Sequence, residues 1–131
     1  MLPGLQPGDY IVARLLGGSP RRGDVVVFTH PQRPGFFLVK RAIGLPGETV
    51  TITPGAVAID GRTRSEAWAF GPLHTQGEWR LGPGQVFMLS DNRNLVTDDS
   101  RSFGPVGGPW WRGVFRYWPL GRVSRLDSQR S

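Results

Sequence analysis

Short apolar runs separated by glycine and proline turns make up most of this 131-residue chain, which contains 19 Gly and 12 Pro. Turn pairs such as Pro46-Gly47, Pro54-Gly55 and Asp60-Gly61 alternate with runs rich in β-branched residues, for example VVVF and TVTIT. β-branched residues favour strands, and turn signals spaced by roughly 8–12 residues are typical of sandwiches and barrels. We therefore predict an all-β, mainly antiparallel fold of barrel-like folded sheets with little helix.

Seven strands are predicted, over residues 10–15, 24–29, 36–43, 49–52, 56–59, 85–89 and 113–118. The dipeptide Asp60-Gly61 follows the fifth run and predicts a hairpin with a type I′ turn. A chain of 131 residues suits a single core. We assign residues 1–121 to one domain and predict that the polar residues 122–131 form a frayed tail.

The charge of the chain favours an anionic partner, because its net charge is +6 and its isoelectric point is near 11.2. A phospholipid surface, a nucleic acid and an acidic protein all fit that charge. Cysteine is absent, which excludes disulfides and thiolate metal sites. His30 and His74 lack ligand spacing, so we predict neither a metal nor a cofactor. No apolar run reaches the roughly 18 residues of a membrane span.

Lys40 is the only lysine among 16 basic residues, and the others are arginine. Arginine keeps its proton in proteins, whereas a desolvated lysine loses it and then acts as a base. Lys40 follows the apolar run 36–39, which we expect to supply part of the apolar surroundings of its amine. The alternative is that a high-GC genome replaced the other lysines and that Lys40 remained by chance.

Four segments resemble the sequence boxes of type I signal peptidases, the Ser-Lys peptidases of family S26. The segment VKRAIGLPGE (39–48) resembles their lysine box, and SDNR (90–93) with DSRSFGPV (99–106) resembles their last box. RGDVVVF (22–28) is similar to the strand box before the lysine, and MLPGLQPGD (1–9) to the box that begins with the nucleophile. Together, and in the family's order, they imply its β fold and its activity.

The resemblance implies that a serine hydroxyl attacks a peptide carbonyl and that a neutral lysine takes its proton. Lys40 matches that general base. Asp99, Ser100 and Arg101 match the supporting residues beside the dyad. Thr97 stands two residues before Asp99, where the family has a serine that hydrogen-bonds the lysine, although this chain has one residue more than the usual spacing ahead of it.

The same box also predicts a structural cluster of ion pairs and turns. Its members are Asp91, Asp98, Asp99, Arg93 and Arg101. Arginines beside these carboxylates would keep them ionised, which argues against a carboxylate pair in acid–base catalysis. We expect the cluster to be structural first and to support the active site.

The family's nucleophile would stand one position before Met1, and none of the eight serines matches it. Ser90 falls where the family has glycine, and we interpret it as a turn residue. Three explanations remain open: a start codon assigned at the methionine of a Ser-Met pair, a trimmed protein, or an inactive paralogue. The first is favoured and predicts that a serine codon and an apolar stretch of about 20 residues lie upstream.

The resemblance further implies that the partner is a signal or leader peptide of a secreted precursor, bound by strand addition. Met1, Leu5, Leu38 and Val39 would line shallow pockets for small residues at the cleavage site, although core packing is an alternative for each. We expect the catalytic domain to lie against an anionic membrane surface on the extracytoplasmic face. The dedicated precursor of nickel superoxide dismutase is an alternative substrate to general secretory precursors.

Three other functions remain as alternatives. A peptide-binding module without activity would keep the fold and lack the nucleophile. A repressor-type autoprotease shares a related β fold, but no DNA-binding module precedes the domain here. A nucleic-acid-binding β domain fits the basic charge, but the arginines are scattered and the lysine box would be unexplained, so no nucleic acid partner is expected.

Overall fold

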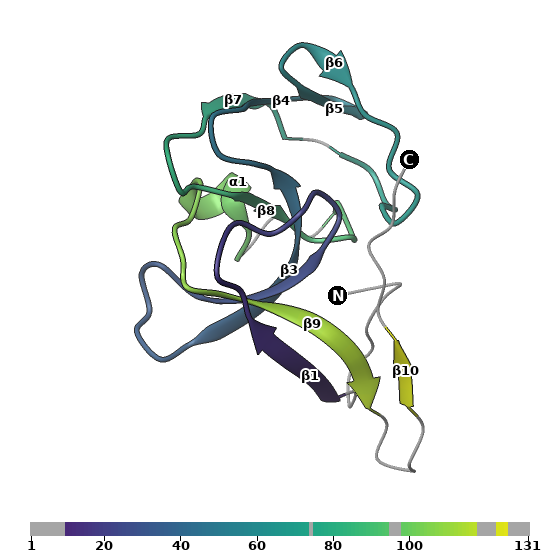
Figure 1. Cartoon of the computed structure of the whole chain (residues 1–131). Coiled ribbons are helices and arrows are strands. Elements are labelled where there is room, and N and C mark those ends of the chain that lie inside the picture. The colour runs from purple at the N-terminus through teal and green to yellow at the C-terminus, as the bar shows by residue number, and fades with distance from the viewer. Residues whose placement is uncertain (1–9, 74, 95–97, 118–122, 126–131) are drawn as a thin grey trace.

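The computed structural model describes residues 10–73, 75–94, 98–117 and 123–125, which form two antiparallel sheets (Figure 1). In chain order the elements are β1 (Tyr10–Leu15), β2 (Val25–Thr29), β3 (Phe37–Gly44), β4 (Thr49–Thr53), β5 (Ala56–Ile59), β6 (Arg62–Thr63), β7 (Gly77–Arg80), β8 (Phe87–Leu89), α1 (Ser100–Phe103), β9 (Trp110–Tyr117) and β10 (Val123–Arg125). Within these ranges α1 is the only helix. The predicted all-β class is confirmed.

The larger sheet has the strand order β1-β9-β2-β3-β8, with β10 also paired to β9. The smaller sheet has the order β6-β5-β4-β7 and lies at one end of the molecule (Figure 1). Strand β3 belongs to the larger sheet and leads through a short turn into β4 of the smaller one. The predicted barrel-like arrangement is therefore two sheets joined at the end of β3.

All seven predicted strands are present, most with shifted ends, and three further strands were not predicted. Two of them, β6 and β7, are short and lack the β-branched runs that indicate strands from sequence. The third, β10, contradicts the prediction that the whole tail after residue 121 is frayed. Strand β2 pairs only with the first three residues of β9, Trp110–Arg112. Backbone groups at the other end of β9, at Phe115–Tyr117, pair with Val123–Arg125 instead.

The predicted hairpin at Asp60-Gly61 joins β5 to β6. Asp60 has a φ of 51° and Gly61 a φ of 83°. Positive φ at both central residues is the requirement of a type I′ turn, which only glycine and a few short polar residues adopt readily. This local prediction is confirmed.

Two apolar cores share the wall formed by β3 and β8. Successive side chains of a strand point to opposite faces, so each strand serves both cores. On β3, Ala42 packs in the core of the larger sheet and Ile43 in that of the smaller. On β8, Met88 and Leu89 divide in the same way. Residues next to each other on β3 therefore meet different surroundings.

Gly44, at the end of β3, is expected to tolerate no larger residue. A Cβ there would overlap the side chain of Val50 and lie 3.1 Å from Cβ of Phe87. We expect Gly44→Ala to lower the free energy of unfolding by about 1–3 kcal/mol, the usual cost of overpacking a core. Gly17→Ala is the matched control, because a Cβ at Gly17 meets nothing within 4 Å. Equal urea midpoints for the two variants would contradict the prediction.

Candidate active site

Lys40 lies in the middle of β3, on the face that also carries Leu38 and Ala42. Leu38 is 8% exposed and Ala42 is fully buried, and both belong to the core of the larger sheet. Lys40 is half-buried at the border of that core. Phe36 and Phe37 do not shield it as expected, because their side chains are 44% and 57% exposed. They contact His30 and Trp111 instead.

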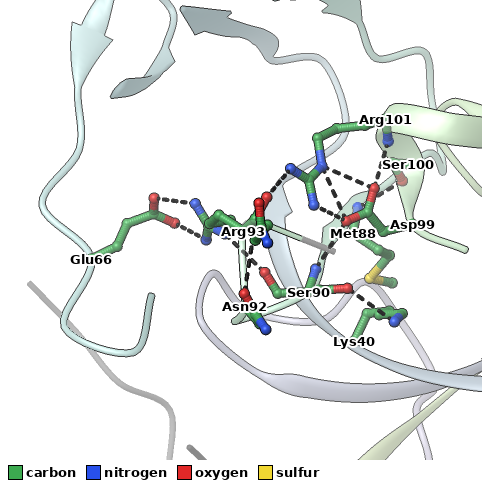
Figure 2. Close-up of polar contacts among 10 residues, drawn as sticks. Lys40, Glu66, Met88, Ser90, Asn92, Arg93, Asp99, Ser100 and Arg101 are labelled. Atoms are coloured by element: carbon green, nitrogen blue, oxygen red, sulfur yellow. Dashed lines mark hydrogen bonds and ion pairs between the residues drawn. The ribbon is translucent and has the colours of Figure 1, made fainter. Parts of the chain in front are cut away.

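The amine of Lys40 donates a hydrogen bond to Ser90, with Nζ 3.0 Å from Oγ (Figure 2). Ser90 directly follows β8, which pairs with β3 so that Arg41 faces Leu89. One step along this antiparallel register, Lys40 and Ser90 stand opposite each other. The interpretation of Ser90 as a turn residue did not include this contact. Residues 50 positions apart meet here only because of the strand register.

Burial lowers the pKa of Lys40 from the ordinary value of a lysine, because an ammonium is poorly solvated there. The carboxylates of Asp99, Asp98 and Asp91 oppose this effect, whereas the guanidinium of Arg101 adds to it. The net direction is downward. A neutral lysine amine therefore forms at lower pH than it would in water.

Asp99 holds the segment behind this contact in place (Figure 2). Its carboxylate caps α1 by accepting from the backbone N–H of Arg101, and it forms an ion pair of 2.7 Å with Arg101 Nη2. It also accepts from the backbone N–H of Ser90 at 3.2 Å. Both side chains of the ion pair are 0% exposed. Ser100 is equally buried, and its hydroxyl accepts from the backbone N–H of Met88.

The predicted ion-pair cluster is only partly correct. Asp99 pairs with Arg101 as expected, but the other acidic and basic members have partners elsewhere. Arg93 forms two hydrogen bonds of 2.8 Å with Glu66.

The remaining acidic members pair outside the box as well. Asp91 forms a buried ion pair with Arg41 at 2.8 Å, and Asp98 lies 3.4 Å from His30 Nε2. Arg41 is the neighbour of Lys40 on β3 and points to the opposite face, over the ring of Trp68. Of these pairs, Asp91–Arg41 joins the box to the strand that carries the lysine, whereas the other two join it to the segments of Glu66 and His30.

Among the described residues, one edge of β3 beside Lys40 is not paired with another strand. Strand β2 pairs with Phe37–Arg41 on one side, whereas β8 pairs with β3 only at Arg41, Ala42 and Gly44. Within the described ranges, no strand pairs with Leu38 and Val39 on the β8 side. Leu38 is buried and Val39 half-buried, so of this pair Val39 offers more surface to a peptide.

The predicted site residues divide into two groups. Lys40, Asp99, Ser100, Arg101, Leu38 and Val39 are described and lie on β3 or at α1. Met1, Leu5 and Thr97 lie outside the described residues. Among the described residues, no group of three or more His, Cys, Asp or Glu could hold a metal ion. None of the helices in those ranges has the length and apolarity to span a membrane.

Comparisons with known proteins agree on one family of peptidases. The family described as "Signal peptidase, peptidase S26" matches residues 1–113. A signal peptidase I of Leptolyngbya laminosa is 36% identical over 140 residues, covering 96% of this chain and 68% of that protein. The thylakoidal processing peptidase 1 of Arabidopsis thaliana is 30% identical over 95% of this chain and 41% of its own length. The crystal structure of a signal peptidase I from Enterococcus faecalis matches with a TM-score of 0.55 and 31% identity, over 68% of this chain and 90% of that one.

Proposed function

Because this chain belongs to the signal peptidase family, peptidase S26, we propose that it removes signal peptides from exported precursor proteins as a serine endopeptidase. Relatives that match most of the chain are named signal peptidase I, and others thylakoidal processing peptidase, which supports this reaction class. The single observation that carries the proposal is the half-buried amine of Lys40 on β3, the only lysine of the chain.

Lys40 is the general base in the proposed mechanism. Its neutral amine takes the proton of a serine hydroxyl while the hydroxyl oxygen bonds to the carbonyl carbon of the scissile peptide. The ammonium then gives this proton to the leaving amine, the C–N bond breaks, and an ester to the serine remains. Water hydrolyses the ester with Lys40 again as base. Burial supports this role, because it lowers the pKa of Lys40 and so favours the neutral amine.

The serine that attacks the substrate is proposed to be the residue that precedes Met1 in the family pattern. Ser90 is the other hydroxyl to consider, since it lies 3.0 Å from the amine of Lys40. Ser90 is only 2% exposed, however. A nucleophile must approach the carbonyl carbon of its substrate, and a hydroxyl so deeply buried is poorly placed for that approach.

The open edge of β3 supports peptide binding by strand addition. An extended substrate would form backbone hydrogen bonds with Leu38 and Val39 and place its alternate side chains against the sheet. The scissile bond would then lie close to Lys40. Met1 and Leu5 are proposed to complete the pockets, which favour a small residue at the cleavage site. The net charge of +6 suits a site on an anionic membrane surface at the extracytoplasmic face.

Cleavage of a secretory precursor tests this function. We define the serine-extended protein as this chain with serine directly before Met1, and its matched control as the chain with alanine there. The serine-extended protein is expected to cleave a precursor in detergent micelles after a small residue, as located by mass spectrometry, and the alanine control is not. Failure of the folded serine-extended protein would support the inactive paralogue. Equal cleavage by both proteins would contradict the proposed nucleophile.

A further inference from the structure

Ser90, which contacts the amine of Lys40, has hydrogen bonds at both of its backbone groups. The backbone N–H of Ser90 donates to Asp99 Oδ2 at 3.2 Å, and its carbonyl accepts from Arg93 Nε at 2.9 Å. Arg93 is itself held by two hydrogen bonds to Glu66 (Figure 2). Both backbone groups of Ser90 are therefore engaged, which fixes the position of the backbone that carries its hydroxyl.

Ser90 Oγ is also the only hydrogen-bond partner of the Lys40 amine among the residues that the structure describes. The charged groups that act on Lys40 have partners of their own: Asp99 pairs with Arg101, Asp91 with Arg41, and Asp98 with His30. These groups act on Lys40 through their charge, whereas Ser90 contacts the amine directly. Among the described residues, it is therefore Ser90 that sets the orientation of the Lys40 amine, whereas the carboxylates and Arg101 act on its charge.

We propose that Ser90 is a positioning residue whose hydroxyl oxygen accepts an N–H of Lys40 and so aims the lone pair of the amine at the substrate side. The inference rests on the proposed function, because aiming matters only if Lys40 acts as a base. A neutral amine has two N–H groups and one lone pair, so fixing one N–H restricts where the lone pair can point. Ser90 stands where the signal peptidase pattern has glycine, which contributes no hydroxyl.

The proposal predicts the effect of removing the hydroxyl on proton binding by Lys40. An ammonium donates a stronger hydrogen bond than a neutral amine, so Ser90 favours the charged form of Lys40. Without the hydroxyl, the amine loses a partner that favours this form. Proton binding by Lys40 is then expected to weaken by about tenfold in Ser90→Ala, the effect of losing one charge-assisted hydrogen bond.

The sole lysine makes this measurement direct. Labelling the chain with 13Cε-lysine gives one lysine side-chain signal, whose shift with pH reports the pKa of Lys40 without any need for peptidase activity. Ser90→Ala should move the titration midpoint to lower pH, and Ser90→Thr, which keeps a hydroxyl, should restore it. Thr51→Ala is the control, because it removes a half-buried hydroxyl on β4, in the smaller sheet and outside the proposed site. Its Lys40 titration should stay at the parent midpoint.

A folded Ser90→Ala protein with the parent midpoint would overturn the proposal, and so would an equal shift in Thr51→Ala. Ser90→Gly removes the same hydroxyl and provides the test if the alanine variant does not fold. In the serine-extended protein, Ser90→Ala should also lower kcat by about 10–100-fold with little change in KM, since a misplaced base slows the chemical step. Because the titration needs no turnover, its outcome is independent of whether the peptidase proposal stands.

Discussion

Replacing Lys40 with methionine in the serine-extended protein is expected to lower kcat/KM for a signal-peptide substrate by about 10²–10⁴-fold, the usual contribution of a general base. Methionine is unbranched and apolar, so it fits the face of β3 between Leu38 and Ala42 while removing the proton acceptor. The urea midpoint should change little. Rates of precursor cleavage and the unfolding curve of the same preparation test both parts.

Lys40→Arg should be equally inactive, although it keeps the positive charge. A guanidinium holds its proton at every usable pH and cannot accept another from a hydroxyl. This variant separates a base from a cation that merely attracts the substrate. Near-parent activity in Lys40→Arg would show that Lys40 is not the base and would leave its solitary occurrence as an accident of composition.

The pH dependence gives a second measure of the same residue. Only the neutral amine accepts a proton, so kcat/KM should rise with pH as Lys40 loses its own. Burial lowers the pKa of Lys40, so the midpoint of this rise should lie below the ordinary lysine value of about 10.4. A profile that rises only at the ordinary value would contradict the desolvated base.

Asp99→Ala is expected to lower the free energy of unfolding by about 3–5 kcal/mol, the cost of breaking a buried ion pair by removing one partner. The guanidinium of Arg101 is 0% exposed and forms an ion pair of 2.7 Å with Asp99. The same substitution removes the cap of α1 and the acceptor for the backbone N–H of Ser90. Urea unfolding followed by tryptophan fluorescence measures the loss.

Glu78→Ala is the matched control for this stability change. Its carboxylate lies 4.0 Å from Arg80, and the two side chains are 55% and 86% exposed. Solvent screens such a pair, so its loss should leave the urea midpoint almost unchanged. Similar midpoints for the two alanine variants would mean that the Asp99–Arg101 pair does not contribute the stability inferred from its burial.

Local features of the fold could be predicted from the sequence because they depend on neighbouring residues. The β-branched run at 25–27 predicts β2, and Asp60-Gly61 predicts a turn whose two central residues both have positive φ. Strands β6 and β7 could not be predicted in this way. Each has only one residue that favours a strand, Thr63 in β6 and Trp79 in β7, and pairing with β5 and β4 makes them strands.

Lys40 could be singled out from the sequence because it is the only lysine and lies in a segment that resembles a known box. The ion-pair partners of the charged residues around Lys40 could not be predicted from the sequence. Asp91 and Arg93 lie close to Asp99 in sequence, yet they pair with Arg41 and Glu66. An ion pair depends on which side chains face each other in space, and sequence separation carries little information on that.

The sequence by itself therefore determined the all-β class, the position of most strands and the residue that carries the proposed chemistry. Each of these follows from backbone preferences or residue types within a few positions. The tertiary structure alone decided that Ser90 faces Lys40, because this depends on the register between β3 and β8. Shifting that register by one residue would turn Ser90 to the other face of the sheet and leave the amine of Lys40 without its hydroxyl partner.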